Sequence, residues 1–115
     1  MGRLTTHILD TAQGCPAANV GIRLFHVDGE RRLVASTTSN ADGRTDQPLV
    51  EGDAMQGGCY ELEFDMGPYF SSQGMKTGEP AFLDTVVIRF SASTGEHYHV
   101  PLLASPWSYS TYRGS

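Results

Sequence analysis

Apolar and polar residues alternate with a period of two along most of the chain, and clusters of glycine, proline, aspartate and asparagine separate the alternating runs. In the clearest run, Tyr60, Leu62 and Phe64 fall on one face and three acidic residues fall on the other. This spacing is typical of a half-buried β-strand, whose side chains point alternately to the core and to solvent. The pattern predicts strands at residues 4–10, 20–27, 33–38, 59–65, 85–91, 97–104 and 108–113.

One segment, residues 67–80, lacks alternation, and Tyr69 and Phe70 near its start favour a short helix there. Many short strands joined by regular turns predict an antiparallel β-sandwich rather than an α/β fold. The length of 115 residues predicts a single domain over residues 1–115. The sheet edges of such a sandwich must be covered or paired, and a homo-oligomer joined through these edges is one solution.

The composition narrows the class of protein further. Hydrophobic residues make up 39% and charged residues 18%, which is enough apolar content for one core and too much for a disordered chain. Eight basic against 13 acidic residues give a net charge of -5. Because neutralised phosphates supply most of the affinity for nucleic acids, we expect no nucleic-acid partner.

Nothing in the chain indicates a membrane protein. The apolar runs are only a few residues long, and the first twenty residues lack the apolar stretch of a signal peptide. We therefore expect no membrane association and a cytoplasmic location. In that reducing compartment Cys15 and Cys59 are expected to be free thiols.

Familiar catalytic motifs do not occur: the sequence has no G-x-S-x-G elbow, no C-x-x-C, no H-E-x-x-H and no glycine-rich phosphate loop. What remains is a set of histidines at outward positions. In the strand at 97–104, alternation places Tyr98, Val100 and Leu102 toward the core, so that His97 and His99 share the outer face.

Two more basic residues belong with this group. His7 points outward if Leu4, Thr6 and Ile8 form the core face of the first strand, and Arg44 directly follows an Asn-Ala-Asp-Gly turn. Taken singly, each of these histidines is more often merely solvated, and Arg44 is equally compatible with an ordinary surface arginine. The pattern alone therefore predicts a β-sandwich with outward histidines and names no reaction.

A metal site is the first alternative for the His-x-His pair, because imidazoles at this spacing can form half of such a site. No cysteine or suitable carboxylate accompanies the pair, so we expect no metal. The C-terminal residues keep a strand-like pattern almost to the chain end, where polar tails usually lose order, which indicates that this end is held in place.

Three separated motifs resemble the transthyretin-like family, in that family's order and spacing. The first is Leu-Thr-Thr-His-Ile-Leu-Asp-Thr-Ala at residues 4–12, and the second is Asn-Ala-Asp-Gly-Arg-Thr at 40–45. The third joins His-Tyr-His-Val-Pro-Leu-Leu at 97–103 to the ending Tyr-Ser-Thr-Tyr-Arg-Gly-Ser at 109–115. The final Tyr-Arg-Gly-Ser resembles the family's enzyme branch, which hydrolyses 5-hydroxyisourate, and not its hormone-carrier branch.

The resemblance implies a sandwich of two four-stranded sheets with one short helix. It also implies a homotetramer, a dimer of dimers, whose sites lie in the cleft between dimers and need no metal or organic cofactor. The catalytic residues that it implies are His7, Arg44, His99 and Ser115. The substrate-binding residues that it implies are His97, Tyr112, Arg113 and Gly114.

The implied reaction is hydrolysis of the N1–C6 bond of 5-hydroxyisourate to 2-oxo-4-hydroxy-4-carboxy-5-ureidoimidazoline, in the breakdown of urate towards allantoin. His7 and His99 would activate and orient water, with the identity of the general base left open, and Arg44 would stabilise the oxyanion. The alternative is a small-ligand carrier without catalysis, which would need an apolar channel where these residues make a polar one.

Overall fold

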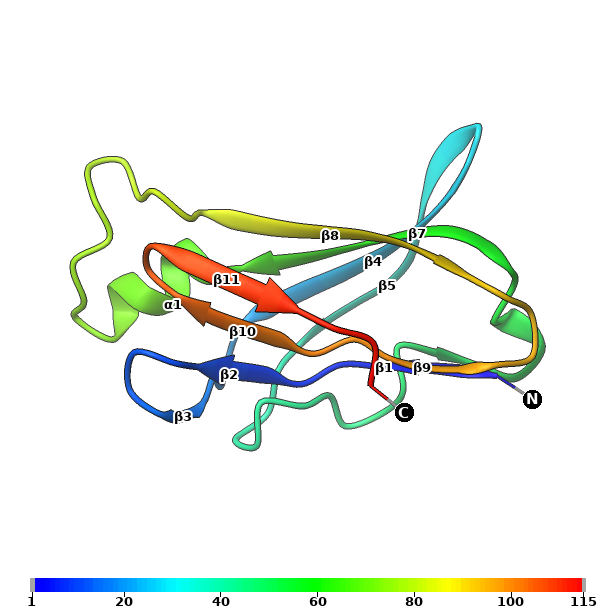
Figure 1. Ribbon diagram of the computed structural model, residues 1–115, viewed down its shortest axis with the longest axis horizontal. Coiled ribbons are helices and arrows are strands. Elements are labelled where there is room, and N and C mark those ends of the chain that lie inside the picture. The colour runs from blue at the N-terminus through cyan, green and yellow to red at the C-terminus, as the bar shows by residue number, and fades with distance from the viewer. Residues whose placement is uncertain (1, 115) are drawn as a thin grey trace.

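The structure is a computed structural model that describes residues 2–114. Two layers of strands face each other, and a short helix lies at one end of them (Figure 1). In chain order the elements are β1 (Arg3–Thr5), β2 (Ile8–Asp10), β3 (Cys15–Pro16), β4 (Gly21–Asp28), β5 (Glu30–Thr38), β6 (Val50–Glu51), the 3-10 turn η1 (Gly52–Ala54), β7 (Gly58–Asp65), α1 (Met66–Ser72), β8 (Thr85–Ala92), β9 (His97–His99), β10 (Leu102–Ser105) and β11 (Ser108–Thr111). The prediction of an all-β fold with one short α-helix is confirmed.

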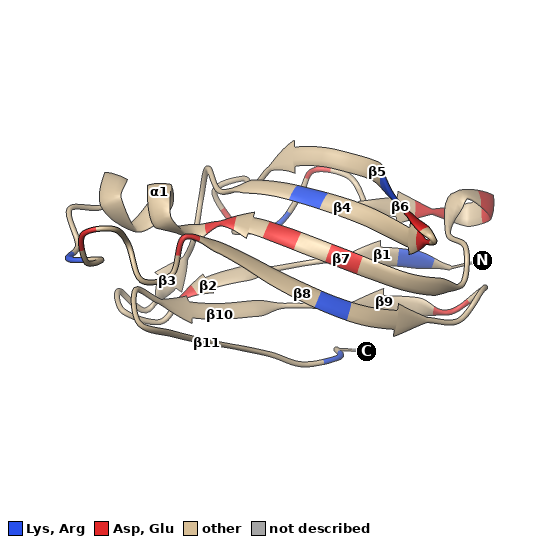
Figure 2. Cartoon of the chain, turned by 90° about the horizontal axis from the view of Figure 1, so that it is seen from above, with Lys and Arg blue, Asp and Glu red and all other residues tan. Residues whose placement is uncertain are grey.

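The first layer is a four-stranded antiparallel sheet in the order β5-β4-β7-β8. Tyr60, Leu62 and Phe64 of β7 are all buried, while the residues between them are half-buried on the outer face. The alternation read from the sequence therefore holds along the whole strand. On the outer face, Arg23 donates hydrogen bonds to both oxygens of Asp65, at 2.9 and 2.7 Å. Figure 2 shows a basic position on β4 next to acidic positions on β7.

The second layer consists of two sheets placed end to end, β6-β1-β9 and β11-β10-β2-β3. Its centre is a parallel pair: Thr5 lies opposite His99 in the first sheet, and Ile8 lies opposite Leu102 in the second. Both pairs are 94 residues apart, so one register runs through both sheets. The two sheets of the second layer therefore continue each other, with a break in the strands at residues 6–7 and 100–101.

Two expectations need correction here. The strands predicted at 4–10 and 97–104 are each divided in two, because Pro101 has no N–H to donate and the carbonyl of Val100 instead accepts a bond from the Thr6 hydroxyl, at 2.7 Å. The first layer is the antiparallel four-stranded sheet that was expected, whereas the second layer contains a four-stranded and a three-stranded sheet, each with one parallel pair. The central pairs of the second layer are parallel, and each joins strands 94 residues apart that a long connection, not a hairpin, links.

The core lies between the layers and takes buried apolar side chains from both. Leu4 and Ile8 of the second layer, for example, are fully buried together with Leu24 of the first. The helix α1 closes one end, where buried Tyr69 donates a hydrogen bond to Asp10 Oδ2 at 2.8 Å. No helix among residues 2–114 is long and apolar enough to cross a membrane.

Candidate functional site

The outward faces of β1 and β9 form the floor of a cavity of about 570 Å³. In the parallel register Arg3 lies opposite His97, and Thr5 lies opposite His99. Paired residues of neighbouring strands point to the same face, so these four side chains leave the sheet together. The loop that follows the turn at 40–43 forms the wall, and it brings Arg44 to the cavity. The prediction that His97 and His99 share an outer face is confirmed.

His99 is the most constrained of these residues. It is half-buried, and its Nδ1 lies 2.9 Å from the hydroxyl Oγ1 of Thr5. Burial lowers the pKa of His99, and the positive charge of Arg44 and the neighbouring His7 lower it further. These causes favour the neutral imidazole at neutral pH, which is the form that a general base needs.

His7 lies between β1 and β2, where the strand is interrupted, and it is also half-buried. Its Nε2 lies 2.9 Å from the backbone carbonyl of Asp42. The turn that carries Asp42 is closed by a hydrogen bond from Gly43 N to Asn40 O, at 2.9 Å, as the Asn-Ala-Asp-Gly sequence predicts. The turn therefore holds His7 as well as presenting Arg44.

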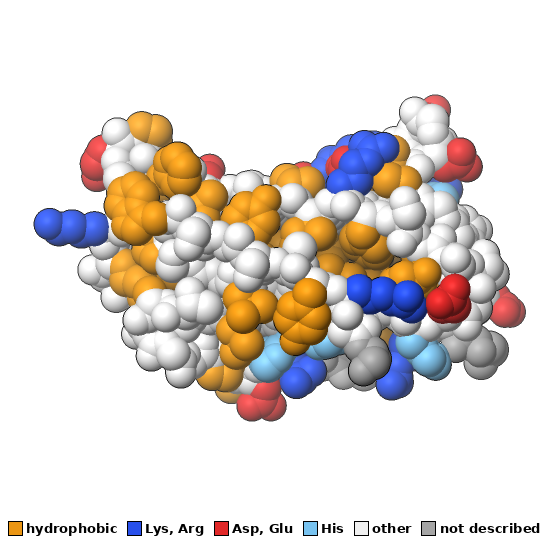
Figure 3. Space-filling model, in the orientation of Figure 1, with side chains coloured by type: hydrophobic (Ala, Val, Ile, Leu, Met, Phe, Trp, Pro, Cys, Tyr) orange, Lys and Arg blue, Asp and Glu red, His pale blue; other side chains and the backbone are white. Residues whose placement is uncertain are grey.

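The lining of the cavity is strongly polar. Arg3, Arg44, His97 and His99 contribute basic groups, whereas Asp46 is the one acidic lining residue within the described chain. Within residues 2–114, the guanidinium of Arg44 makes no hydrogen bond and no ion pair, so its donors are free for a ligand. Figure 3 shows histidine and basic side chains next to one another along the lower edge of the molecule. This arrangement suits a small anionic molecule that carries several oxygens.

The C-terminal tail docks against β9 instead of lining the cavity. Gly114 donates its N–H to the backbone carbonyl of His99, at 2.6 Å, and forms an isolated antiparallel bridge with it. The Arg113 guanidinium lies 4.2 Å from the ring centroid of Tyr98 and donates to Glu96 Oε1 and to the backbone oxygen of His97, both at 3.2 Å. The prediction that this end of the chain is held in place is confirmed.

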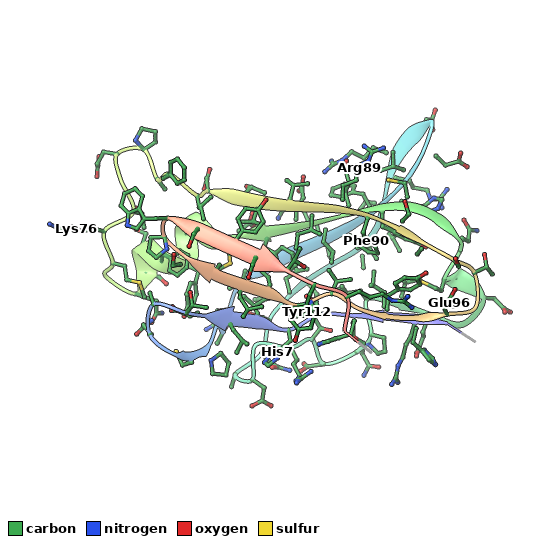
Figure 4. All side chains as sticks on the ribbon, in the orientation of Figure 1. His7, Lys76, Arg89, Phe90, Glu96 and Tyr112 are labelled. Atoms are coloured by element: carbon green, nitrogen blue, oxygen red, sulfur yellow. The ribbon has the colours of Figure 1, made fainter. Side chains whose placement is uncertain are left out.

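The structure thus brings together only part of the expected site. Arg44, His97 and His99 line the cavity, and His7 is close enough to influence the pKa of His99. The remaining expected residues differ: Arg113 and Gly114 hold the tail, Tyr112 is exposed, and Ser115 lies outside the described residues. In Figure 4, His7 and Tyr112 lie near the middle of the molecule, and Glu96 lies at its right end, where the chain passes from β8 to β9.

Sequence reasoning did not assign a role to two residues of the cavity floor, Arg3 and Thr5. The signal was present in the alternation, since Arg3, Thr5 and His7 are spaced by two and share the outer face of the first strand. In the described part of the chain, no three His, Cys, Asp or Glu side chains gather as a metal site would require. The expectation of a metal-free site stays a prediction.

The model of the HIUase/Transthyretin family matches residues 4–114. A 5-hydroxyisourate hydrolase of Pseudomonas aeruginosa is 55% identical over 100% of this chain and 93% of its own length. One of Ralstonia nicotianae is also 55% identical and is covered over its full length.

Solved structures of a 5-hydroxyisourate hydrolase and of a transthyretin have the same fold as this chain. The 5-hydroxyisourate hydrolase of Klebsiella pneumoniae superimposes with a TM-score of 0.83 at 31% identity, with both chains covered completely. Sea bream transthyretin in complex with thyroxine superimposes with a TM-score of 0.87 at 30% identity, over 97% of this chain and 94% of its own. The backbone alone therefore does not separate the hydrolases from the hormone carriers. On the strength of the full-length match, the chain belongs to the HIUase/Transthyretin family.

Proposed function

We propose that this protein is an enzyme that hydrolyses 5-hydroxyisourate. The observation that carries the proposal is the polar cavity over β1 and β9, in which a half-buried histidine, His99, lines the same space as Arg44, whose guanidinium has no hydrogen-bond or ion-pair partner within residues 2–114. The relatives that are 55% identical over the whole chain carry the name 5-hydroxyisourate hydrolase. The match over residues 4–114 also supports a single catalytic domain over residues 1–115.

The reaction breaks the N1–C6 amide bond of the substrate. Water adds its oxygen to C6, the carbonyl oxygen carries negative charge in the tetrahedral intermediate, and the C6–N1 bond then breaks. One proton of the water ends on N1, which becomes the terminal nitrogen of a ureido group. C6 stays bonded to C5 as a carboxylate, and the second proton of the water is released to solvent. The protein must supply a base for the water, a positive group for the oxyanion and a proton for N1.

The proposed roles follow from position and charge. His99 and His7 activate and orient the water, and a positioned base of this kind contributes about 10²–10⁴-fold. Arg44 binds the carbonyl oxygen and stabilises its developing charge with two parallel N–H groups. His97, on the same face as His99, contacts the substrate ring. Ser115 is kept as a proposed catalytic residue and Tyr112 as a proposed substrate-binding residue. Arg113 and Gly114, also proposed to bind substrate, pack against β9, so we assign them the indirect role of holding this end of the chain beside His99.

A homotetramer would complete the site. In the single chain the cavity is open and Tyr112 is 60% exposed. Tyr109 of β11, an edge strand of the second layer, and Trp107 in the turn before it are also exposed. We propose a dimer of dimers in which the second layers face each other and close the cavity. Cys15 and Cys59 are both free, which supports the proposed cytoplasmic location. The substrate is a small molecule, and the mechanism needs no cofactor.

The alternative is a small-ligand carrier, because a transthyretin with bound thyroxine has the same fold. A carrier of an aromatic hormone needs an apolar binding surface. The basic groups of Arg3, Arg44, His97 and His99 give this cavity the opposite character, so the hydrolase is favoured.

The test is direct. Urate oxidase generates 5-hydroxyisourate from urate in the cuvette, and ultraviolet absorbance follows its decay with and without the protein. We expect decay well above the spontaneous rate. If the folded protein gives no acceleration, the hydrolase proposal is wrong, and binding of thyroxine-like aromatics becomes the next measurement.

A further inference from the structure

Thr5 contacts the ring of His99, and this contact helps to decide whether His99 or His7 acts as the general base. Thr5 and His99 are direct partners in the parallel register of β1 and β9, and the Thr5 hydroxyl lies 2.9 Å from His99 Nδ1. Threonine is branched at Cβ, so its hydroxyl has few positions in a strand. The next residue, Thr6, turns its hydroxyl to the opposite face, where it bonds the Val100 carbonyl. Of the two adjacent threonines, only Thr5 therefore turns its hydroxyl to the ring of His99.

The contacts around His99 leave one edge of its ring for chemistry. Thr5 occupies Nδ1, and Gly114 packs against the Cβ, Cγ and Cδ2 atoms so closely that an added Cβ would lie 2.7 Å from Cδ2. Within residues 2–114, Nε2 has no hydrogen-bond partner. A neutral imidazole has one N–H donor and one lone-pair acceptor, so the partner of Nδ1 decides what Nε2 can do.

His7 has the opposite arrangement. Its Nε2 faces the backbone carbonyl of Asp42 at 2.9 Å, and a carbonyl oxygen can only accept. Nε2 of His7 must therefore carry a proton, and this nitrogen is not free to take another from water. The two histidines therefore differ at Nε2: this nitrogen already carries a proton in His7, whereas in His99 it can accept one if Nδ1 carries the ring proton.

The charge of the cavity orients the dipole of His99. Arg44 and Arg3 line the same space and make it positive, which favours the lone-pair side of the neutral imidazole facing the cavity and the N–H side facing away. The hydroxyl of Thr5 lies at Nδ1 of the ring, where it can accept the N–H and leave the lone pair on Nε2.

We propose that the Thr5 hydroxyl accepts the Nδ1–H of His99 and thereby fixes the Nε2 lone pair toward the cavity, which makes His99 the general base and Thr5 its positioning residue. The inference about the base rests on the proposed hydrolase function. The inference about the proton on His99 does not, because it concerns the protein without substrate.

Nitrogen NMR of protein labelled with ¹⁵N-histidine reads the tautomer of each ring directly. At a pH where the rings are neutral, we expect His99 to carry its proton on Nδ1 and His7 to carry its proton on Nε2. Thr5→Val keeps the shape of the side chain and removes the acceptor, so the His99 signals should move toward the Nε2–H form while those of His7 stay. Thr5→Ser should restore the wild-type signals of His99.

Kinetics supply the second measurement. We expect Thr5→Val to lower kcat by about tenfold or more with little change in KM, since it acts on the base and not on substrate contacts. Thr5→Ser should recover most of this loss. Thr85→Val, on an exposed strand residue of the opposite layer, makes the same chemical change and should alter neither the signals nor kcat.

Two results would overturn the proposal: an Nε2–H tautomer of His99 in the unmodified protein, or unchanged His99 signals and kcat in Thr5→Val. If Thr5→Val does not fold, the unmodified protein and Thr5→Ser still decide the tautomer. If the protein does not hydrolyse 5-hydroxyisourate at all, the proposed function fails while the NMR result still tests the contact between Thr5 and His99.

Discussion

Gly114 lies so close to the ring of His99 that a single added carbon would collide with it. An ideal Cβ on Gly114 would be 2.7 Å from His99 Cδ2 and 3.2 Å from both Cγ and Cβ. Any other residue at position 114 must therefore displace either the ring or the tail. The glycine of the terminal motif is required for close approach to the histidine, and the contact connects the chain end to the candidate base.

Gly114→Ala should therefore lower kcat/KM by about tenfold or more, because it displaces a positioned base. Assay of 5-hydroxyisourate decay measures this loss, and circular dichroism checks that the variant is folded. A double-mutant cycle with His99→Ala identifies the cause, since the destabilisation by Gly114→Ala should shrink when the ring is absent. Wild-type activity in Gly114→Ala would show that the contact is unimportant.

Arg113 should act through the tail and not through the substrate. Arg113→Ala removes the contacts with the Tyr98 ring and the His97 carbonyl, so hydrogen exchange at the Gly114 N–H should accelerate and kcat/KM should fall. Glu96→Gln is the matched control, because the exposed ion pair with Arg113 is worth less than about 1 kcal/mol. A large activity loss in Glu96→Gln would contradict this division of roles.

Arg44 should matter for catalysis and little for folding. Its guanidinium makes no hydrogen bond or ion pair within the described chain, so Arg44→Ala should leave the free energy of unfolding nearly unchanged. Loss of oxyanion stabilisation should lower kcat/KM by about 10² or more. His7→Ala and His99→Ala should show losses of similar size, about 10² or more. Full turnover in all three variants would contradict the site.

The pH dependence should report His99. Burial, Arg44 and His7 all lower the pKa of His99, so the neutral base persists to lower pH than for an ordinary histidine. kcat/KM should fall only when the pH drops through this lowered pKa. Arg44→Gln removes a positive charge that disfavours the protonated form of His99, so the NMR titration midpoint of His99 should move to higher pH. A midpoint that moves down or stays would contradict the electrostatic assignment.

The outer charges of the first layer should affect stability alone. The hydrogen bonds from Arg23 hold the pKa of Asp65 below its usual range, so this pair stabilises the fold above the pKa that Asp65 has when unfolded. That contribution disappears as the pH falls through the lowered folded-state pKa. Arg23→Gln should cost about 1 kcal/mol at neutral pH and less in acid, with unchanged kcat. Denaturant unfolding at both pH values measures the difference.

Much of the architecture follows from local pattern. The alternation in β7 and the burial of Tyr98, Val100 and Leu102 are visible in the sequence because a strand exposes every second residue. The helix was expected within residues 67–80 because alternation stops there, and it begins slightly earlier, at Met66. These features depend only on neighbours along the chain.

The parts that could not be predicted depend on residues far apart. The parallel pairing of β1 with β9 joins segments 94 residues distant, and no local pattern specifies that register. Without the register, the contact between Thr5 and His99 is invisible, although alternation puts both on outer faces. Arg113 contacts three residues at β9 and just before it, namely Glu96, His97 and Tyr98. The residues next to Arg113 in the sequence give no sign of these contacts.

The floor of the cavity has a consequence for the order in which the molecule is made. A ribosome releases β1 early, whereas β9 and the tail residue that packs on His99 are among the last to appear. Until β9 appears, β1 lacks its parallel partner in the sheet. Pairing β1 with β9 closes a loop of about ninety residues, and the entropy lost in closing so long a loop makes this step slow. A nascent chain can therefore complete the first layer before β9 exists, and the proposed site forms only after β9 has paired with β1.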